Sequence, residues 1–436
     1  MIRFLFVLAT VFGNLLPGLA AETAGSPNFR FDFGGREPAG FQGVTPSTLY
    51  SPDRGFGFEP GAEVKSFSRG GKNAQVDGFC TSERPFQFSV AVPEGNYAVT
   101  VVLGDAQEAS RTTIKSELRR LMVEGVEMPA GQFATQTFLV NVRTPRIPGG
   151  GEVRLKERER TSEWMNWDEK LTLEFNDRRP AVCSVEIHPA KPAATIFLLG
   201  DSTVCDQPRE PYASWGQMLP RFFDERVVVA NHAESGESLR SSLGSHRLEK
   251  VLASMAPGDF LFIQYGHNDM KEKGEGVGAF TTFKTDLKRF VAGARQRGGR
   301  PVVITPMHRR TFDAAGKIAN SHGDYPAAVR DVAREENVPL IDLQAMSKPF
   351  YESLESLGRD QSKRAFAPGD GTHHNNYGSY QLARCVMEGI RTNQLGLEQF
   401  FAAAAVAKFD PARPGSPEEF HLPASGSMNA PKPLGN

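Results

Sequence analysis

The sequence predicts an all-β sandwich domain followed by an α/β domain built on a parallel sheet. Residues 27–190 hold short runs of β-forming residues separated by Gly, Pro, Asn and Asp. Residues 194–408 instead alternate nearly continuous apolar runs with helical patterns. A chain of 436 residues also exceeds the usual size of one domain, so two domains are expected.

Ahead of these domains, residues 1–21 have the layout of a secretory signal peptide. Arg3 is followed by an apolar run that ends at Leu16, and cleavage is expected after Ala20 or Ala21. A membrane anchor is the alternative, but the run is short for a span and its flank is not strongly basic. The sequence therefore predicts a secreted or periplasmic protein with no membrane association after cleavage.

The first domain is expected to be an antiparallel sandwich. Its strands are predicted in FRFDFG, FQFSVAVPEGNYAVTVVLGD, QTFLVNVR, KLTLEF and CSVEIHP, with a turn at PEGNY. Only RTTIKSELRRLMVEG, residues 111–125, has a helical pattern of any length, and it too carries several β-formers.

After a linker at HPAKPAAT, the second domain has five segments typical of strands buried on both faces. These are ATIFLLG, RVVVANHA, DFLFIQYGHND, RPVVITPMH and VPLIDL. Between them, apolar stripes at helical spacing run from Phe283 to Ala294 and from Ala328 to Ala333. Strands alternating with helices imply a parallel sheet covered on both faces. Residues 409–436, rich in Pro, Gly and Ser, are expected to be a disordered tail.

The overall charge and the cysteines limit the function classes. The formal net charge is −1, and no broad basic field would attract nucleic acid or anionic lipid. Cys80, Cys183, Cys205 and Cys385 are too few for a disulfide framework in a chain of this length. Export and two cysteines per domain make Cys80–Cys183 and Cys205–Cys385 natural pairs, with buried free thiols as the alternative.

Chemistry-bearing residues follow the strands of the second domain. In a wound parallel sheet, sites form where loops leave the carboxyl ends of the strands. The first strand is followed by GDSTVCDQ, which places Asp201 and Ser202 directly after Gly200. A serine there would be exposed at the sheet edge, although a serine that caps a helix would give the same letters.

The next two strand exits hold groups that suit an oxyanion hole. Gly236 follows the second strand in NHAESGES, and Asn268 follows the third in YGHND. Backbone N–H groups and a side-chain amide stabilise a developing oxyanion. The Ser202 N–H, the Gly236 N–H and the Asn268 amide are the right types, and a plain turn glycine is the alternative for Gly236.

A carboxylate and a histidine complete the predicted site. In GDGTHHNNYG, Asp370 and His373 stand three residues apart just before a helical pattern. In a turn, the carboxylate can reach the imidazole Nδ1–H and leave Nε2 to take a proton from Ser202. Asp370 could also touch His374 on a regular helix, so the spacing favours His373 without excluding its neighbour.

The blocks GDSTV, ESGES, YGHND and DGTHH resemble the SGNH (GDSL-type) hydrolases, with Ser202, Gly236, Asn268 and His373 in the four name-giving places. The resemblance covers roughly residues 195–392. Within this superfamily, GDSTVCDQ, SWGQML, GHND and TPMHRRTFD look like the rhamnogalacturonan acetylesterases, which remove acetyl groups from pectin backbone sugars.

This resemblance implies a three-layer, flavodoxin-like fold and catalysis without a metal or cofactor. It implies Ser202 as nucleophile, His373 as base and Asp370 as its partner, with Gly236 and Asn268 in the oxyanion hole. Predicted substrate contacts are His308 and Arg309, from their place at the fourth strand exit, and His374, for which the superfamily pattern asks nothing in particular.

The first domain resembles galactose-binding-like β-sandwiches that often accompany polysaccharide enzymes. Trp164 and Trp167 in EWMNW could stack on sugar faces, since flat aromatic surfaces suit pyranose rings. Packing or domain docking is the favoured alternative for this pair.

Two rival functions are weighed against the esterase. A metal-dependent phosphoesterase would draw its ligands from the acidic residues and histidines near the strand exits: Asp201, Asp206, His232, His267, Asp269, Asp370, His373 and His374. That interpretation leaves Ser202 and Gly236 unexplained, and no histidine pair has the H-x-x-x-H spacing. A non-catalytic carbohydrate-binding protein would have no reason to keep five groups that fit one reaction.

The sequence therefore predicts a secreted, monomeric carbohydrate esterase that removes acetyl groups by a Ser-His-Asp acyl-enzyme mechanism. Its predicted partner is an acetylated plant polysaccharide, with rhamnogalacturonan as the favoured substrate and acetylated xylan or another acetylated polysaccharide as alternatives. No nucleic acid, membrane, metal or cofactor is expected.

Overall fold

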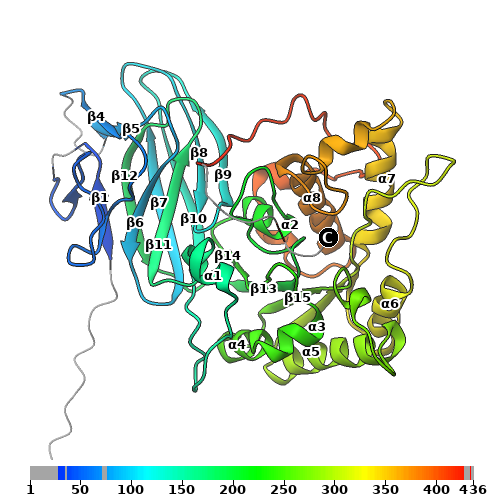
Figure 1. Cartoon of the computed structure of the whole chain (residues 1–436). Coiled ribbons are helices and arrows are strands. Elements are labelled where there is room, and N and C mark those ends of the chain that lie inside the picture. Colours follow the sequence, from blue (N-terminus) through cyan, green and yellow to red (C-terminus); the bar gives the residue numbers. More distant parts are fainter. Residues whose placement is uncertain (1–27, 35–36, 71–75, 427–432, 434–436) are drawn as a thin grey trace, which may run out of the picture.

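The computed structural model describes residues 28–34, 37–70, 76–426 and 433 (Figure 1). The predicted signal peptide at 1–21 lies outside these residues. Among the helices of the described part, none combines the length and the hydrophobicity of a membrane span.

The N-terminal half of the described chain is a sandwich of two sheets. One sheet has the order β10-β7-β12-β1-β2, with β5 on β12 and β4 on β5: β1 (Phe29–Asp32), β2 (Gln42–Gly43), β4 (Lys65–Ser68), β5 (Gly78–Thr81), β7 (Gly95–Gly104), β10 (Phe133–Val142) and β12 (Val182–Pro189). The other has the order β3-β6-β11-β8-β9: β3 (Phe56–Phe58), β6 (Phe86–Ala91), β8 (Ser110–Ser116), β9 (Arg120–Met128) and β11 (Lys170–Asn176). Edge-on phenylalanines such as Phe33 and Phe88 fill the space between the sheets. The all-β prediction for this half is confirmed.

Residues 111–125 form a hairpin where the sequence showed a helical pattern. Strands β8 and β9 pair antiparallel across a turn at Glu117–Arg119. Glu117 and Arg119 have φ angles of 52° and 65°, which side-chain-bearing residues seldom adopt. The turn is held by β11, because the Thr172 N–H donates to Glu117 Oε1 at 3.0 Å and the Glu117 N–H donates to the Thr172 carbonyl. Pairing with a distant strand therefore overrides the local helical spacing.

The C-terminal half contains a parallel sheet of order β14-β13-β15-β16-β17. Its strands are β13 (Ala194–Gly200), β14 (Val227–Asn231), β15 (Phe260–Gln264), β16 (Arg300–Ile304) and β17 (Leu340–Ile341). Numbered along the chain, this is the order 2-1-3-4-5 of flavodoxin-like sheets. The predicted fold class of this half is confirmed.

Helices cover both faces of this sheet and make three layers. The main helices are α2 (Trp215–Met218), α3 (Leu239–Gly244), α4 (Arg247–Ser254), α5 (Lys284–Gln296), α6 (Tyr325–Glu335), α7 (Leu343–Glu355) and α8 (Asn376–Thr392). Ile196 and Leu198 of β13 join the core that includes α2, α7 and α8, whereas Phe197 and Leu199 join the core that includes α3 to α6. Shorter helices are α1 (Glu157–Thr161), η2 (Trp164–Asn166), η3 (Leu219–Phe222), η4 (Asp269–Lys271), η5 (Ala279–Phe283), η6 (Gln361–Ala365), η7 (Glu398–Phe400) and η8 (Ala403–Ala405).

The two halves are packed side by side (Figure 1). Leu121 of β9 belongs to the core of the α/β half. Ala98 and Leu139 of the sandwich form a second contact with Val228 of β14. Apolar side chains of the sandwich thus bury surface of the α/β sheet and of its helices.

The segment predicted to be a disordered tail is structured over residues 409–426. Phe420 packs against the rings of Tyr377 and Tyr380 on α8, with centroids 5.6 and 5.2 Å away. Farther along, the buried Lys115 ammonium donates to the Pro423 carbonyl at 2.8 Å and to Ser425 Oγ at 2.7 Å. A Pro- and Gly-rich segment needs no regular structure of its own when side chains on both domains bind its backbone and one of its rings.

Removing residues 413–436 is expected to lower the free energy of unfolding by about 2–4 kcal/mol, because the buried Lys115 ammonium loses two acceptors. Urea unfolding at neutral pH measures this change. In the full chain, Phe420→Ala should account for about 1–2 kcal/mol of it, since the ring is only partly buried. An unchanged unfolding midpoint in the truncated chain would contradict the prediction that residues 413–436 stabilise the fold.

All four cysteines are buried free thiols, so neither Cys80–Cys183 nor Cys205–Cys385 is bridged. Cys80 and Cys183 each donate a hydrogen bond to a backbone carbonyl, at 3.4 and 3.2 Å. Burial raises the pKa of both thiols to about 12. The sequence left open two alternatives, paired disulfides and buried free thiols, and the structure shows the second.

Candidate active site

Ser202, His373 and Asp370 form a continuous hydrogen-bonded line. The two ends come from the exit of β13 and from the turn ahead of α8. His373 Nε2 lies 2.8 Å from Ser202 Oγ, and His373 Nδ1 lies 2.9 Å from Asp370 Oδ2. An ionised carboxylate only accepts, so Nδ1 carries the proton and Nε2 is the acceptor for the serine hydroxyl. The serine is 1% exposed, in contrast to the open position expected from the sequence.

The turn that carries Ser202 is fixed by its neighbours. A Cβ on Gly200 would lie 2.5 Å from Val204 Cγ2 and 2.8 Å from the Gln264 carbonyl, so only glycine fits there. Asp201 accepts hydrogen bonds from the Thr203 N–H and hydroxyl, at 2.9 and 2.7 Å. Burial alone would raise the pKa of Asp201, but the nearby His267 and Thr203 lower it below its usual value. The carboxylate therefore stays charged and anchors the turn.

The predicted oxyanion donors lie on adjacent loops. Gly236 has a φ of 78°, so the loop after β14 needs a glycine there whichever role it plays. Asn268 Nδ2 donates to the carbonyl of Glu237 at 3.0 Å, which joins the loop after β15 to the loop after β14. Within the described residues, the backbone N–H groups of Ser202 and Gly236 have no hydrogen-bonding partner. An oxyanion needs donors that are not already engaged, so both N–H groups are available for the predicted role.

His374 points away from this chemistry. Its Nε2 lies 2.7 Å from the Tyr351 hydroxyl, and its ring packs against Phe366 with centroids 4.4 Å apart. The side chain is 2% exposed, and its burial lowers its pKa to about 3. The predicted substrate contact at His374 does not fit this placement, because the residue belongs to the core under α8.

His374 should make stability pH-dependent. Its pKa lies below the ordinary 6.5 in the folded chain, so the unfolded chain binds its proton first as the pH falls. The stability that it contributes is present above pH 6.5 and is lost as the pH falls towards 3, at up to about 1.4 kcal/mol per pH unit. His374→Gln, which keeps a hydrogen-bonding group for Tyr351, should give a shallower loss in urea unfolding between pH 6 and 4. The exposed His188→Gln is the matched control, and equal slopes in both variants would contradict the prediction.

The other two predicted substrate contacts differ in position. Arg309 is partly buried beside the site, where its guanidinium donates to Thr372 Oγ1 at 3.1 Å and to the His267 carbonyl at 3.2 Å. His308 is 6% exposed, its N–H donates to Ser347 Oγ, and burial lowers its pKa to about 4. Only Arg309 therefore adjoins the turn that carries His373.

The structure does not gather the residues proposed as metal ligands. Asp206 binds Arg120 at 2.6 Å, and Asp269 accepts the N–H groups of Gly266 and Leu239 at 2.8 and 2.9 Å. His232 packs edge-on against a tryptophan. Across the described ranges, no three His, Cys, Asp or Glu side chains are grouped as a metal site would need.

Residues of the sandwich that sequence reasoning did not identify hold the loop after Ser202. Arg119 Nη1 donates to the carbonyls of Gln207 and Tyr212, at 2.8 and 3.0 Å. Gln207 Nε2 in turn donates to the Ser202 carbonyl at 2.6 Å. Arg119 stands in a hairpin turn far upstream in the sequence, and no spacing or motif signals this contact.

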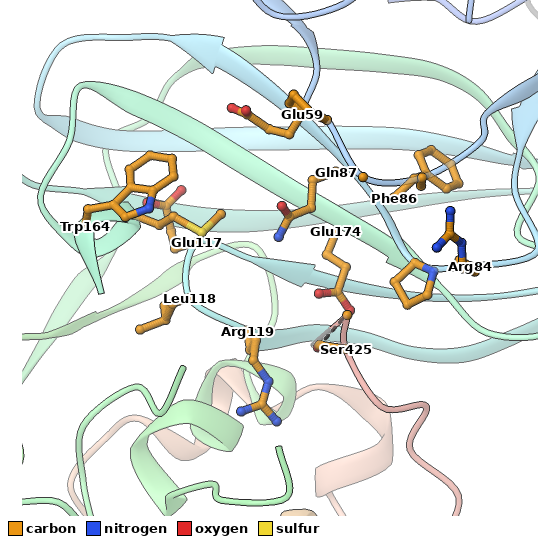
Figure 2. A pocket seen from close by; sticks show the side chains of 16 residues that line it. Glu59, Arg84, Phe86, Gln87, Glu117, Leu118, Arg119, Trp164, Glu174 and Ser425 are labelled. Atoms are coloured by element: carbon orange, nitrogen blue, oxygen red, sulfur yellow. Dashed lines mark hydrogen bonds between the residues drawn. The ribbon is translucent and has the colours of Figure 1, made fainter. Parts of the chain in front are cut away.

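The turn that holds Arg119 also closes a cavity of about 570 Å³ on the sandwich. Figure 2 shows Trp164 and Arg84 at opposite ends of this cavity, with Arg119 extending towards the helices of the α/β half. Trp164 is 36% exposed, with the Lys170 ammonium 4.4 Å from its ring centre. Trp167 is instead buried, and its Nε1 donates to Glu159 at 2.9 Å. The two tryptophans thus have different environments: Trp167 packs against its neighbours, whereas Trp164 faces the cavity.

Comparisons with known proteins agree with this architecture. Residues 198–379 match the GDSL-like lipase/acylhydrolase family, and residues 29–144 match the galactose-binding domain-like domain of β-agarase/YXIM esterase-like proteins. Rhamnogalacturonan acetylesterase RhgT of Bacillus subtilis strain 168 is 40% identical over 217 residues, which cover 46% of this chain and 90% of the relative. The uncharacterized esterase YxiM of the same organism is 27% identical over 401 residues, or 89% of this chain and 96% of the relative. The crystal structure of YxiM covers 84% of this chain and 99% of its own, with 25% identity and a TM-score of 0.46.

Three findings point the same way: the 40% identity to RhgT over 90% of that relative, the family match at residues 198–379, and the strand order of the parallel sheet. The chain belongs to the GDSL-like lipase/acylhydrolase family, with the SGNH hydrolase fold and a galactose-binding domain-like sandwich ahead of it.

Proposed function

We propose that this protein is exported and removes acetyl groups from acetylated rhamnogalacturonan. The broader class, a serine-type carbohydrate acetylesterase, follows from the family and from relatives named as acetylesterases. The observation that carries the mechanism is the line from Ser202 Oγ through His373 to Asp370, with both hydrogen bonds already at 2.8–2.9 Å.

The first half of the reaction transfers the acetyl group to the enzyme. His373 Nε2 takes the Ser202 proton while Oγ attacks the acetyl carbonyl, and Asp370 stabilises the imidazolium that forms. The Ser202 N–H, the Gly236 N–H and the Asn268 amide stabilise the oxyanion of the tetrahedral intermediate. Collapse of that intermediate breaks the bond to the sugar oxygen, which takes the proton from His373 and leaves as a hydroxyl.

The second half restores the serine. His373 Nε2 now removes a proton from water, which attacks the acetyl carbonyl through a second tetrahedral intermediate at the same donors. Acetate leaves, and the proton returns to Ser202 Oγ. In this proposal the protons move between Ser202, His373, water and the leaving sugar oxygen, without a metal or cofactor.

The choice of rhamnogalacturonan is supported by the 40% identity to RhgT, which is named for that activity. Arg309 adds a cation next to the turn of His373, where it would suit a substrate that carries carboxylates near its acetyl esters. Acetylated xylan lacks such regularly spaced acidic sugars, so it is the natural comparison substrate.

Acetate release from acetylated rhamnogalacturonan and from acetylated xylan, with and without EDTA, tests this proposal. We expect faster release from rhamnogalacturonan and no effect of the chelator. Faster release from xylan would overturn the substrate assignment but keep the esterase. Loss of activity with EDTA would favour the metal-dependent alternative, and no release from any acetylated substrate would favour a binding protein.

A further inference from the structure

A cation of the sandwich lies directly behind the proposed oxyanion hole. Lys156 Nζ donates to the Ser235 carbonyl at 2.6 Å and pairs with Glu237 Oε1 at 2.7 Å. Glu237 is 1% exposed and the Lys156 side chain is 30% exposed, so the contact is buried on the carboxylate side and partly open on the ammonium side. Both partners of Lys156 flank Gly236, whose N–H is one of the proposed donors.

The Ser235 carbonyl and the Gly236 N–H belong to one peptide group. Because that group is planar, a bond that fixes the direction of the carbonyl also fixes the direction of the N–H on its other side. A charge-assisted hydrogen bond to the oxygen also polarises the peptide and strengthens its N–H as a donor. Gly236 has a φ of 78°, and a glycine can adopt many other backbone conformations. A hydrogen bond from outside the loop therefore restricts the orientation of this peptide.

The rest of the sandwich segment that includes Lys156 is firmly attached. Glu159 accepts a capping hydrogen bond from the Lys156 N–H at 2.8 Å and binds the buried Arg247 of α4, at 3.0 Å through Nη1 and 2.6 Å through Nη2. The ammonium therefore extends from a backbone that is itself anchored to the hydrolase half.

We infer that Lys156 is a positioning residue for the esterase reaction: the sandwich aims and polarises the 235–236 peptide so that the Gly236 N–H stabilises the oxyanion. The inference rests on the proposed serine esterase chemistry but not on the identity of the sugar. It gives the sandwich a role inside the catalytic step, separate from any role in binding polysaccharide.

The test compares Lys156→Met with wild type in hydrolysis of p-nitrophenyl acetate, which needs no sugar contacts. We expect kcat to fall about tenfold or more, below the 10²–10³-fold that loss of an entire oxyanion donor costs. KM should be unchanged, and Lys156→Arg should recover most of kcat. The matched control is Arg154→Met, since Arg154 lies two residues away and donates to the Gly244 carbonyl at 3.3 Å, away from Gly236.

One further variant separates positioning from simple loss of an ion pair. Lys156→Met leaves the buried Glu237 carboxylate short of a partner, so Lys156→Met/Glu237→Gln removes that charge as well. We expect Lys156→Met to lower the melting temperature and the double variant to restore it. If turnover nevertheless stays slow in the double variant, the Ser235 carbonyl contact is responsible. Restored kcat in the double variant, or equal kcat in Lys156→Met and wild type, would overturn the inference. No hydrolysis by wild type would instead count against the proposed function.

Discussion

His373→Ala is expected to lower kcat for acetate release by about 10⁶-fold, and Ser202→Ala by a similar factor. Each substitution removes a partner of the 2.8 Å contact between Nε2 and Oγ, and members of such a triad act as a unit. The double variant should therefore be no slower than either single variant. Single-turnover assays with acetylated rhamnogalacturonan and with p-nitrophenyl acetate measure these rates.

The neighbouring histidine is the control for this prediction. His374→Gln keeps a hydrogen-bonding group for Tyr351 and should keep kcat within about twofold, because His374 does not touch the serine. A large loss of kcat in His374→Gln with an unchanged melting temperature would show that the wrong histidine has been assigned. Substantial turnover by His373→Ala would lead to the same conclusion.

Asn268→Ala is expected to lower kcat by about 10²–10³-fold with little change in KM, because it removes an oxyanion donor that matters most in the transition state. The Asn268 amide also donates to the Glu237 carbonyl, so a change in fold must be excluded. Asn393→Ala serves as the control, since Asn393 donates to the Leu340 carbonyl at 2.8 Å at the far end of α8. Near-full activity of Asn268→Ala would contradict its assignment as an oxyanion donor.

The parts of the site that could be predicted from sequence are those with local signals. Buried parallel strands read as continuous apolar runs, and the residue after each run falls at one edge of the sheet. Ser202, Gly236 and Asn268 could therefore be placed together without a structure. Asp370 and His373 lie three residues apart in one turn, so their contact too is a short-range property.

Contacts between segments far apart in sequence could not be predicted in this way. Arg119 and Lys156 carry no motif, and their roles depend on how the sandwich docks beside the hydrolase sheet. The hairpin at 111–125 could not be predicted because this segment has both a helical spacing and β-forming residues. Its strand structure depends on pairing with β11, which is distant in sequence. The segment 409–426 was expected to be disordered because its composition shows only that it forms no regular element, whereas its ring and backbone are bound by both domains.

The packing of Leu121 into the hydrolase core limits how the hydrolase domain can be used on its own in protein engineering. The side chain enters the hydrolase core from the sandwich, while Arg119 on the same hairpin supplies donors for carbonyls of the loop after Ser202. Expressing residues 194–408 alone would remove Leu121 from that core and would remove the two Arg119 hydrogen bonds from the loop. RhgT aligns with 46% of this chain over 90% of its own length, so most of its length has no counterpart of this sandwich. A hydrolase domain expressed without the sandwich would need substitutions that replace the Leu121 contact in the core and the Arg119 hydrogen bonds to the loop.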